Sequence, residues 1–151
     1  MKKVIFRTVV TAALAVILGC ATMPATDEGK AAPDDLAAAV VDKLAGAYEN
    51  RDVSGFMTLV SARYFEGYGD LQTALEEALD TVVSADLDIR PERIWQREDG
   101  MVLMDAGWSK TIMRSTAPET ETTSGRVTFI FIRYRTDVLK LFSQKGDPVF
   151  P

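Results

Sequence analysis

The sequence predicts an α+β fold in which three helices come first and an antiparallel sheet follows. Up to about residue 82, apolar residues recur with the spacing of one helix face, whereas from Asp86 onward they alternate with polar residues, as in strands. The alternating half also contains Asp99-Gly100, a dipeptide typical of two-residue hairpin turns. Helices in one part of the chain and hairpin-linked strands in the other indicate an α+β layout.

Three apolar stripes define the expected helices. Asp34, Asp52 and Asp70 stand where an aspartate can cap a helix. The first helix would end at about Asn50, the second is shorter, and the glycine-containing stretch 64–70 separates the second from the third. The three stripes consist of Leu36, Val40, Leu44 and Tyr48, of Val53, Phe56, Met57 and Val60, and of Leu71, Leu75, Leu79 and Val82.

Five stretches with a period of two define the expected strands. They cover residues 86–89, 92–98, 101–113, 126–135 and 138–145. Asp99-Gly100 would join the second to the third, and Thr136-Asp137 would join the last two. The polar segment 115–125 is interpreted as a loop.

The pattern of the last two strands also predicts a surface for a protein partner. Pairing them about Thr136-Asp137 sets Tyr134 opposite Leu139, and this apolar face is expected to cover the helices. The opposite face then exposes three rings, those of Phe129, Phe131 and Phe142. Because contiguous apolar patches usually mark interfaces, we expect a homodimer, or another protein partner, on this face. The alternative is that a one-residue slip in register, or cover from the 115–125 loop, buries these rings within one chain.

The first twenty residues carry the clearest functional signal. A basic start with Lys2, Lys3 and Arg7 precedes a short apolar run, which ends at Gly19-Cys20. This junction resembles the lipobox of bacterial lipoproteins, whose cysteine receives a lipid before the leader is removed. The resemblance implies a signal peptide at 1–19, a lipidated Cys20 with a tether to residue 33, and a domain at 34–151. The alternative is an ordinary signal peptide that happens to contain a cysteine.

Lipidation would determine where the domain is located. Two or more acyl chains give nearly permanent anchoring. By resemblance to lipoproteins of two-membrane bacteria, Ala21 after the cysteine implies the periplasmic side of the outer membrane. Removing the leader takes away three of the 17 basic residues and none of the 22 acidic ones, which leaves a net charge of −8. This acidic balance argues against nucleic acid as a partner.

The composition also limits the chemistry. The chain has no histidine, which excludes Ser-His-Asp and Cys-His systems and zinc sites built on histidine. The glycines at 67 and 69 lack the third glycine of a dinucleotide loop, and Pro91 occupies the glycine position of a calcium loop that would start at Asp86. We therefore expect no cofactor and no metal.

The segment 40–53, VVDKLAGAYENRDV, resembles the first helix and following turn of ketosteroid isomerases and SnoaL-like cyclases. Residues 139–142 with 146–150 are similar to the closing strand of small lipoproteins with the same fold. The resemblance covers most of residues 35–150. It implies a nuclear-transport-factor-2-like cone, in which a curved sheet wraps around the first helix and leaves a pocket at the wide end.

This superfamily contains enzymes, ligand binders and adaptor domains, so individual residues must decide between them. The resemblance places Leu44 where the isomerases have a catalytic tyrosine, and a leucine cannot donate the required hydrogen bond. The isomerase base falls near Tyr68, with Asp70 two residues away. Asp105 lies in an otherwise apolar strand, where it could act as a base in a pocket or simply face water. Asp105, Asp70 and Tyr68 are thus the weak catalytic candidates.

Aromatic residues supply candidates for a ligand pocket, although core packing is the more common role of such residues. The candidates are Tyr48, Tyr64, Tyr68, Trp95 and Trp108. We expect a lipid-anchored, extracytoplasmic binding or assembly module without established catalysis. The alternative is a small isomerase- or cyclase-type enzyme that uses an Asp/Tyr pair on a small apolar ligand.

Overall fold

The computed structural model describes residues 32–151. The predicted signal peptide, Cys20 and the tether up to residue 31 lie outside the described residues. The elements are α1 (Pro33–Glu49), α2 (Val53–Thr58), α3 (Tyr68–Asp80), β1 (Val82–Gln96), β2 (Val102–Arg114), β3 (Ala117–Arg135) and β4 (Val138–Gly146). The four strands form one antiparallel sheet in the order β1-β2-β3-β4, which confirms the α+β prediction.

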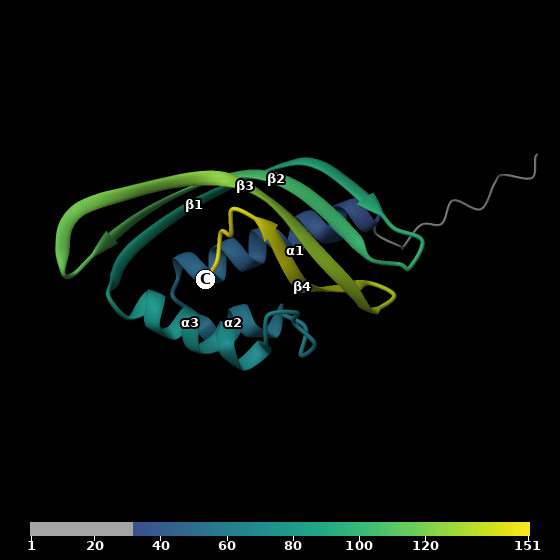
Figure 1. Cartoon of the computed structure of the whole chain (residues 1–151), viewed down its shortest axis with the longest axis horizontal. Helices are drawn as coiled ribbons and strands as arrows, with labels where there is room; N and C mark the ends of the chain where they lie inside the picture. The colour runs from purple at the N-terminus through teal and green to yellow at the C-terminus, as the bar shows by residue number, and fades with distance from the viewer. Residues whose placement is uncertain (1–31) are drawn as a thin grey trace, which may run out of the picture.

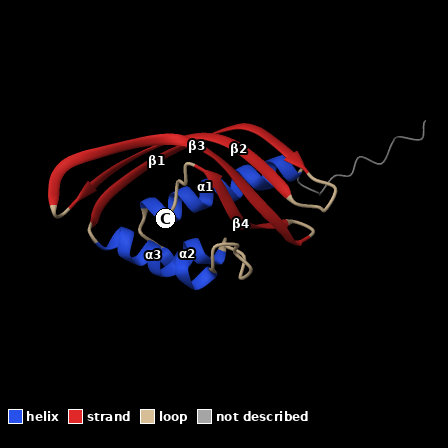
Figure 2. Cartoon of the chain, viewed as in Figure 1, coloured by secondary structure: helices blue, strands red, loops and turns tan. Residues whose placement is uncertain are grey.

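The sheet arches over the helices. Figure 1 shows α1 in the hollow of the sheet, with α2 and α3 below it. All three helices lie on the concave side, and the described part of the chain places no helix on the convex side (Figure 2). One face of the sheet therefore encloses the core, and the other is free of helical cover.

The helix boundaries follow local chemistry. α1 begins with Pro33 at its first position, which suits the fixed φ of proline, so Asp34 lies within the first turn and is not the cap that we expected. Asp52 does cap α2, because its Oδ1 accepts the Gly55 N–H at 2.8 Å. Asp70 lies in the first turn of α3, where its charge is favourable, and Gly67 takes the cap position.

The first hairpin confirms its sequence signal, with one change. β1 is a single strand with an irregularity between Pro91 and Arg93, in place of the two strands expected there. Gly100, with φ of +83°, forms the turn, and the Arg97 N–H donates to the Met101 carbonyl at 2.8 Å. The bend at Pro91 lets a long strand follow the curvature of the sheet.

The expectation of a loop at 115–125 is wrong. β2 and β3 continue as a long hairpin in which Thr111 pairs with Thr122 and Ile112 with Glu121. The hydroxyls of Thr111 and Thr122 lie 3.1 Å apart. Threonine is β-branched and favours strands, and this cross-strand hydrogen bond compensates for the small apolar content of the segment.

The expected orientation of β3 is also wrong. The predicted pairs Phe129–Gln144 and Ile130–Ser143 are present, but register shifts on both sides of the segment 131–133 then set Phe131 opposite Leu141. Phe129 and Phe131 are fully buried on the concave side. Because side chains alternate, Ile130 lies on the convex face instead. The one-residue slip, which the sequence left open as the alternative, lets two large rings and Leu141 share the core face.

Candidate functional site

The interior of the cone is filled by the chain's own residues. From β4 the segment 147–151 turns back between the sheet and the helices, as Figure 1 shows at the yellow end of the ribbon. Phe150 is 1% exposed, and its ring lies 4.7 Å from that of Phe56, 5.6 Å from Tyr48 and 6.3 Å from Phe129. We call residues 147–150 the plug. It occupies the space where the fold family was expected to have a pocket.

Hydrogen bonds hold the plug at each of its ends. The Gln144 side chain donates from Nε2 to the Phe150 carbonyl at 2.9 Å, and its Oε1 accepts the Phe150 N–H at 3.4 Å. At the other end, the Trp108 indole donates to the Asp147 carbonyl at 3.0 Å, and the Asp147 N–H donates to the Arg126 carbonyl at 2.8 Å. The plug is thus held at both ends, and its residues Val149 and Phe150 are buried in the core.

Two glycines make the turn into the core possible. Gly146 has φ of +100°, and a Cβ at this position would lie 2.7 Å from the Arg126 carbonyl oxygen. A Cβ on Gly125 would lie 2.6 Å from the Cβ of Asp147. Any larger residue at either position would therefore push the plug away from β3.

Lys110 ties β2 to the plug. Its Nζ donates to the Val149 carbonyl at 2.7 Å and lies 5.5 Å from the centre of the Tyr48 ring and 5.6 Å from that of Trp108. Burial, together with the nearby charge of Arg114, lowers the pKa of Lys110. Within residues 32–151 no carboxylate lies at ion-pair distance from its Nζ. Lys110 therefore serves as a hydrogen-bond donor to the plug.

The five aromatic pocket candidates do not form one cluster. Tyr48 and Trp108 are buried around the plug, and Tyr64 is buried near Gln144. Tyr68 is half-buried, and its hydroxyl donates to the Met57 carbonyl at 3.2 Å. Trp95 lies on the convex face, because its neighbour Ile94 packs against the core. Tyr64 borders a cleft beside the plug, and Trp108 borders a separate depression on β2 and β3.

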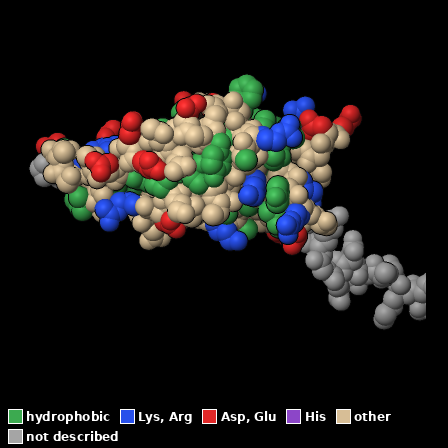
Figure 3. Space-filling model, turned by 90° about the horizontal axis from the view of Figure 1, so that it is seen from below, with side chains coloured by type: hydrophobic (Ala, Val, Ile, Leu, Met, Phe, Trp, Pro, Cys, Tyr) green, Lys and Arg blue, Asp and Glu red, His purple; other side chains and the backbone are tan. Residues whose placement is uncertain are grey.

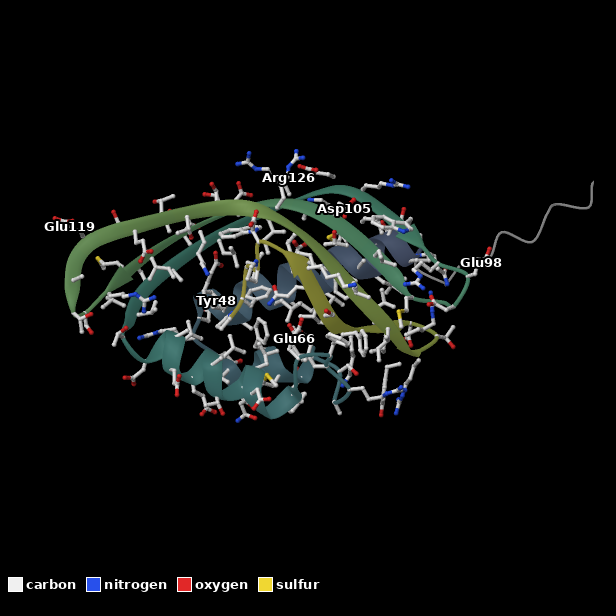
Figure 4. All side chains as sticks on the ribbon, viewed as in Figure 1. Tyr48, Glu66, Glu98, Asp105, Glu119 and Arg126 are labelled. Carbon is white, nitrogen blue, oxygen red and sulfur yellow. The ribbon has the colours of Figure 1, made fainter. Side chains whose placement is uncertain are left out.

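That cleft has a volume of about 350 Å³ and lies beside the plug. Its lining consists of Tyr64, Glu66, Asp70, Leu71, Ala74, Gln144, Gly146, Pro148 and Pro151. Figure 4 shows Glu66 between β4 and the helical layer. Asp70 is the one weak catalytic candidate at the cleft. Sequence analysis missed Glu66, Gln144 and the two prolines, because only the fold brings these segments together.

Asp105 lies on the other side of the sheet. Figure 4 shows it at the sheet near the convex side, where Arg126 also projects. Its Oδ1 accepts a hydrogen bond from the Thr128 hydroxyl at 2.7 Å on the neighbouring strand. Asp105 is half-buried and borders a shallow depression together with Glu92 and Lys145. No tyrosine is among the residues that line this depression.

An apolar row crosses the convex face. Trp95 pairs with Leu103 and Leu103 with Ile130, all on the side away from the core. Phe142 is half-buried, and its ring lies 6.4 Å from that of Phe65, which is 73% exposed. We call Trp95, Leu103, Ile130 and Phe142 the convex apolar row. Phe65, from the segment between α2 and α3, adjoins it at the edge of β4, and Ile130 itself is only 7% exposed. Of the three predicted interface rings, only Phe142 lies outside the core cluster.

Charges of both signs border this row. Arg93, Asp105, Thr128 and Lys145 are aligned across the four strands in the next row. The guanidinium of Arg93 also lies 4.8 Å from the centre of the Trp95 ring, and Arg126 pairs with Glu92 at 3.1 Å. On the opposite, helical side, apolar side chains likewise reach the surface among charged ones (Figure 3).

Burial raises the pKa of the Tyr48 and Tyr64 hydroxyls above their ordinary value of about 10, and for Tyr64 the carboxylate of Glu66 adds to this effect. Unfolded tyrosines would therefore lose their protons first as the pH rises. Above pH 10, the free energy of unfolding is expected to fall by up to about 1.4 kcal/mol per pH unit for each such group. Tyr64→Phe should reduce this fall in urea titrations at several pH values. Tyr134→Phe, at a site that is 62% exposed, is the control, and an equal effect of the two variants would contradict the assignment.

Within residues 32–151, no group of three or more histidine, cysteine, aspartate or glutamate side chains is arranged to hold a metal ion. In the same range, no helix has the length and apolar character needed to cross a membrane.

No protein-family model and no curated protein sequence matches the chain, but solved structures do. Aln2 from a Streptomyces species has a TM-score of 0.64 at 13% identity and covers 78% of this chain and 92% of its own. A nuclear transport factor 2-like protein from Salmonella enterica has a TM-score of 0.63 at 11% identity, and the match covers 72% of this chain and 85% of that protein. A ketosteroid isomerase-like protein from Erwinia carotovora has a TM-score of 0.64 at 11% identity, and the match covers 80% of this chain and 100% of that protein. The chain therefore has the nuclear-transport-factor-2-like fold.

Proposed function

We propose that this protein is a lipid-anchored binding or assembly module and not an enzyme. One observation carries the proposal: Phe150 packs against three aromatic rings inside the cone, in the space where an enzyme of this fold would hold its substrate. A cavity filled by the protein's own side chains supports a module, whereas catalysis requires an open pocket with convergent polar groups.

The enzyme alternative has less support. Asp105 bonds Thr128 on the convex side, and the Tyr68 hydroxyl is engaged with a backbone carbonyl. Tyr64 does lie near Glu66, but Glu66 is exposed, so the pair lacks the desolvated carboxylate that a general base near neutral pH needs. The similarity to the ketosteroid isomerase-like protein, at 11% identity, concerns the fold alone.

The convex face is the proposed docking surface, with a second copy of the chain as occupant. The convex apolar row supplies the contact area. The adjoining row carries Arg93, Asp105 and Lys145, so charges of both signs lie beside the apolar contact area. A surface with charges of both signs around an apolar centre has the composition that is typical of a protein interface.

Anchoring through Cys20 is the second part of the proposal, and Cys20→Ser tests it. Without the thiol no lipid can be attached, so the variant is expected to leave the membrane fraction or to keep its leader, with an essentially complete loss of detergent-phase partitioning. Detergent-phase separation and intact-mass measurement of the purified chain give the result. A serine variant that matures normally and stays membrane-bound would rule out the lipid anchor.

A further inference from the structure

The cleft beside the plug has an unusual combination of walls and charge. Leu71, Ala74, Pro148 and Pro151 form apolar walls, and its volume of about 350 Å³ lies within the range of small-molecule sites. Its polar lining contains two carboxylates, those of Glu66 and Asp70, and none of the lining residues is basic. A ligand that enters this cleft meets apolar surface and negative charge.

The carboxylate of Glu66 is held in place. The Ser143 hydroxyl donates to its Oε1 at 3.4 Å, and Tyr64 lies near enough for the Glu66 charge to raise the pKa of the Tyr64 hydroxyl. Tyr64 and Ser143 are both more than nine-tenths buried, so the core fixes the positions of both side chains beside Glu66. Within the described residues, Glu66 takes part in no ion pair. A carboxylate has about four acceptor positions, so Glu66 retains capacity for a further donor.

The floor of the cleft is rigid. Gln144 is 8% exposed, and the nitrogen and the oxygen of its side-chain amide both form hydrogen bonds with the backbone of Phe150. Gly146 and Pro148 belong to the turn that carries the chain into the core, and Leu71 is buried on α3. The site is therefore formed in advance, which lowers the entropic cost of binding.

We propose that this cleft binds a small organic cation, a protonated amine on an apolar or aromatic body. The apolar part would lie against Leu71, Ala74 and the two prolines. The ammonium group would donate to the Glu66 carboxylate, within the field of Asp70. Charge-assisted hydrogen bonds of this kind are about twice as strong as neutral ones, and an anion would be repelled.

Three probes of similar size test the proposal: 2-phenylethylamine, 2-phenylethanol and 3-phenylpropanoate. They are titrated into the ¹⁵N-labelled full chain in non-ionic detergent, and the backbone amide signals of Ala74 and Gly146 are followed. The amine is expected to cause saturable shifts at these residues, with the alcohol binding at least tenfold more weakly and the carboxylate not at all. Shifts that fail to saturate, or an alcohol that binds as tightly as the amine, would overturn the proposal.

Variants separate charge from shape. Glu66→Gln keeps the size of an exposed side chain. It is expected to weaken binding of the amine about tenfold and to leave binding of the alcohol unchanged. Ala74→Phe should fill the cleft and reduce binding of both probes. Glu77→Gln, an exposed acid of α3 outside the cleft, is the matched control. Equal effects of the Glu66 and Glu77 variants would show that general charge, and not this site, attracts the amine.

Discussion

Phe150→Ala is expected to lower the free energy of unfolding by about 3–5 kcal/mol, the usual cost of truncating a buried phenylalanine. Phe150 is 1% exposed and contacts rings from α1, α2 and β3, so its removal leaves a cavity at the point where these elements meet. Urea unfolding followed by circular dichroism gives the value. Phe65→Ala, at a ring that is 73% exposed, is the control and should change stability by less than about 0.5 kcal/mol.

Phe150→Ala also tests whether the plug fills the space that would otherwise be a ligand pocket. A cavity lined by Tyr48, Phe56 and Phe129 should take up a small aromatic such as benzene, because engineered apolar cavities do so. Benzene should then raise the midpoint of unfolding of Phe150→Ala and not that of the wild-type chain. A variant with wild-type stability would mean that the plug does not fill the interior, and the proposal of a non-catalytic module would lose its main support.

The order of elements was predictable because it depends on local patterns. The helix stripes place apolar side chains on one face whatever lies opposite, and Val40, Val41, Leu44 and Tyr48 are buried as expected. The Asp99-Gly100 hairpin is equally local. These signals arise within a few residues of chain, and no knowledge of the rest of the fold is needed to interpret them.

The faces of the last two strands were not predictable in the same way. A turn at Thr136-Asp137 fixes a register, but a slip of one residue exchanges the two faces of a strand, and alternation alone does not reveal it. The choice is made by tertiary packing, because Phe129 and Phe131 bury more apolar surface than Ile130 and Ile132. In the same way, the threonines of 115–125 form a strand because β2 offers a partner.

The plug and the cleft depend on contacts between distant segments. Gly146-Asp147-Pro148 indicated the end of a strand, but nothing in the sequence stated that Val149 and Phe150 turn inward. The turn requires Gly125, which is far away in the chain and whose missing side chain makes room for Asp147. Likewise, Glu66 and Gln144 become neighbours only when the segment before α3 lies along β4, where the Phe65 N–H donates to the Phe142 carbonyl, so the anionic character of the cleft was not visible in the sequence.

Phe131→Glu is expected to unfold the chain, and Phe142→Glu is expected to leave it folded. Phe131 is fully buried opposite Val102 and Leu141, so the substitution places an unpaired carboxylate in the core, at a cost of more than about 5 kcal/mol. This is of the same order as the whole stability of a typical domain. Phe142 is half-buried on the convex side, where water can solvate the new charge.

Sedimentation and circular dichroism, applied together to both variants, test the core assignment and the proposed interface. If a second copy docks on the convex apolar row, the wild-type chain sediments as a dimer and Phe142→Glu as a folded monomer, because a charge at the centre of an interface disfavours association. A folded Phe131→Glu variant would contradict the register of β3 against β4. A wild-type chain that stays monomeric at the highest concentration reached would exclude self-association through this face, and the docking surface would then have to serve a different protein.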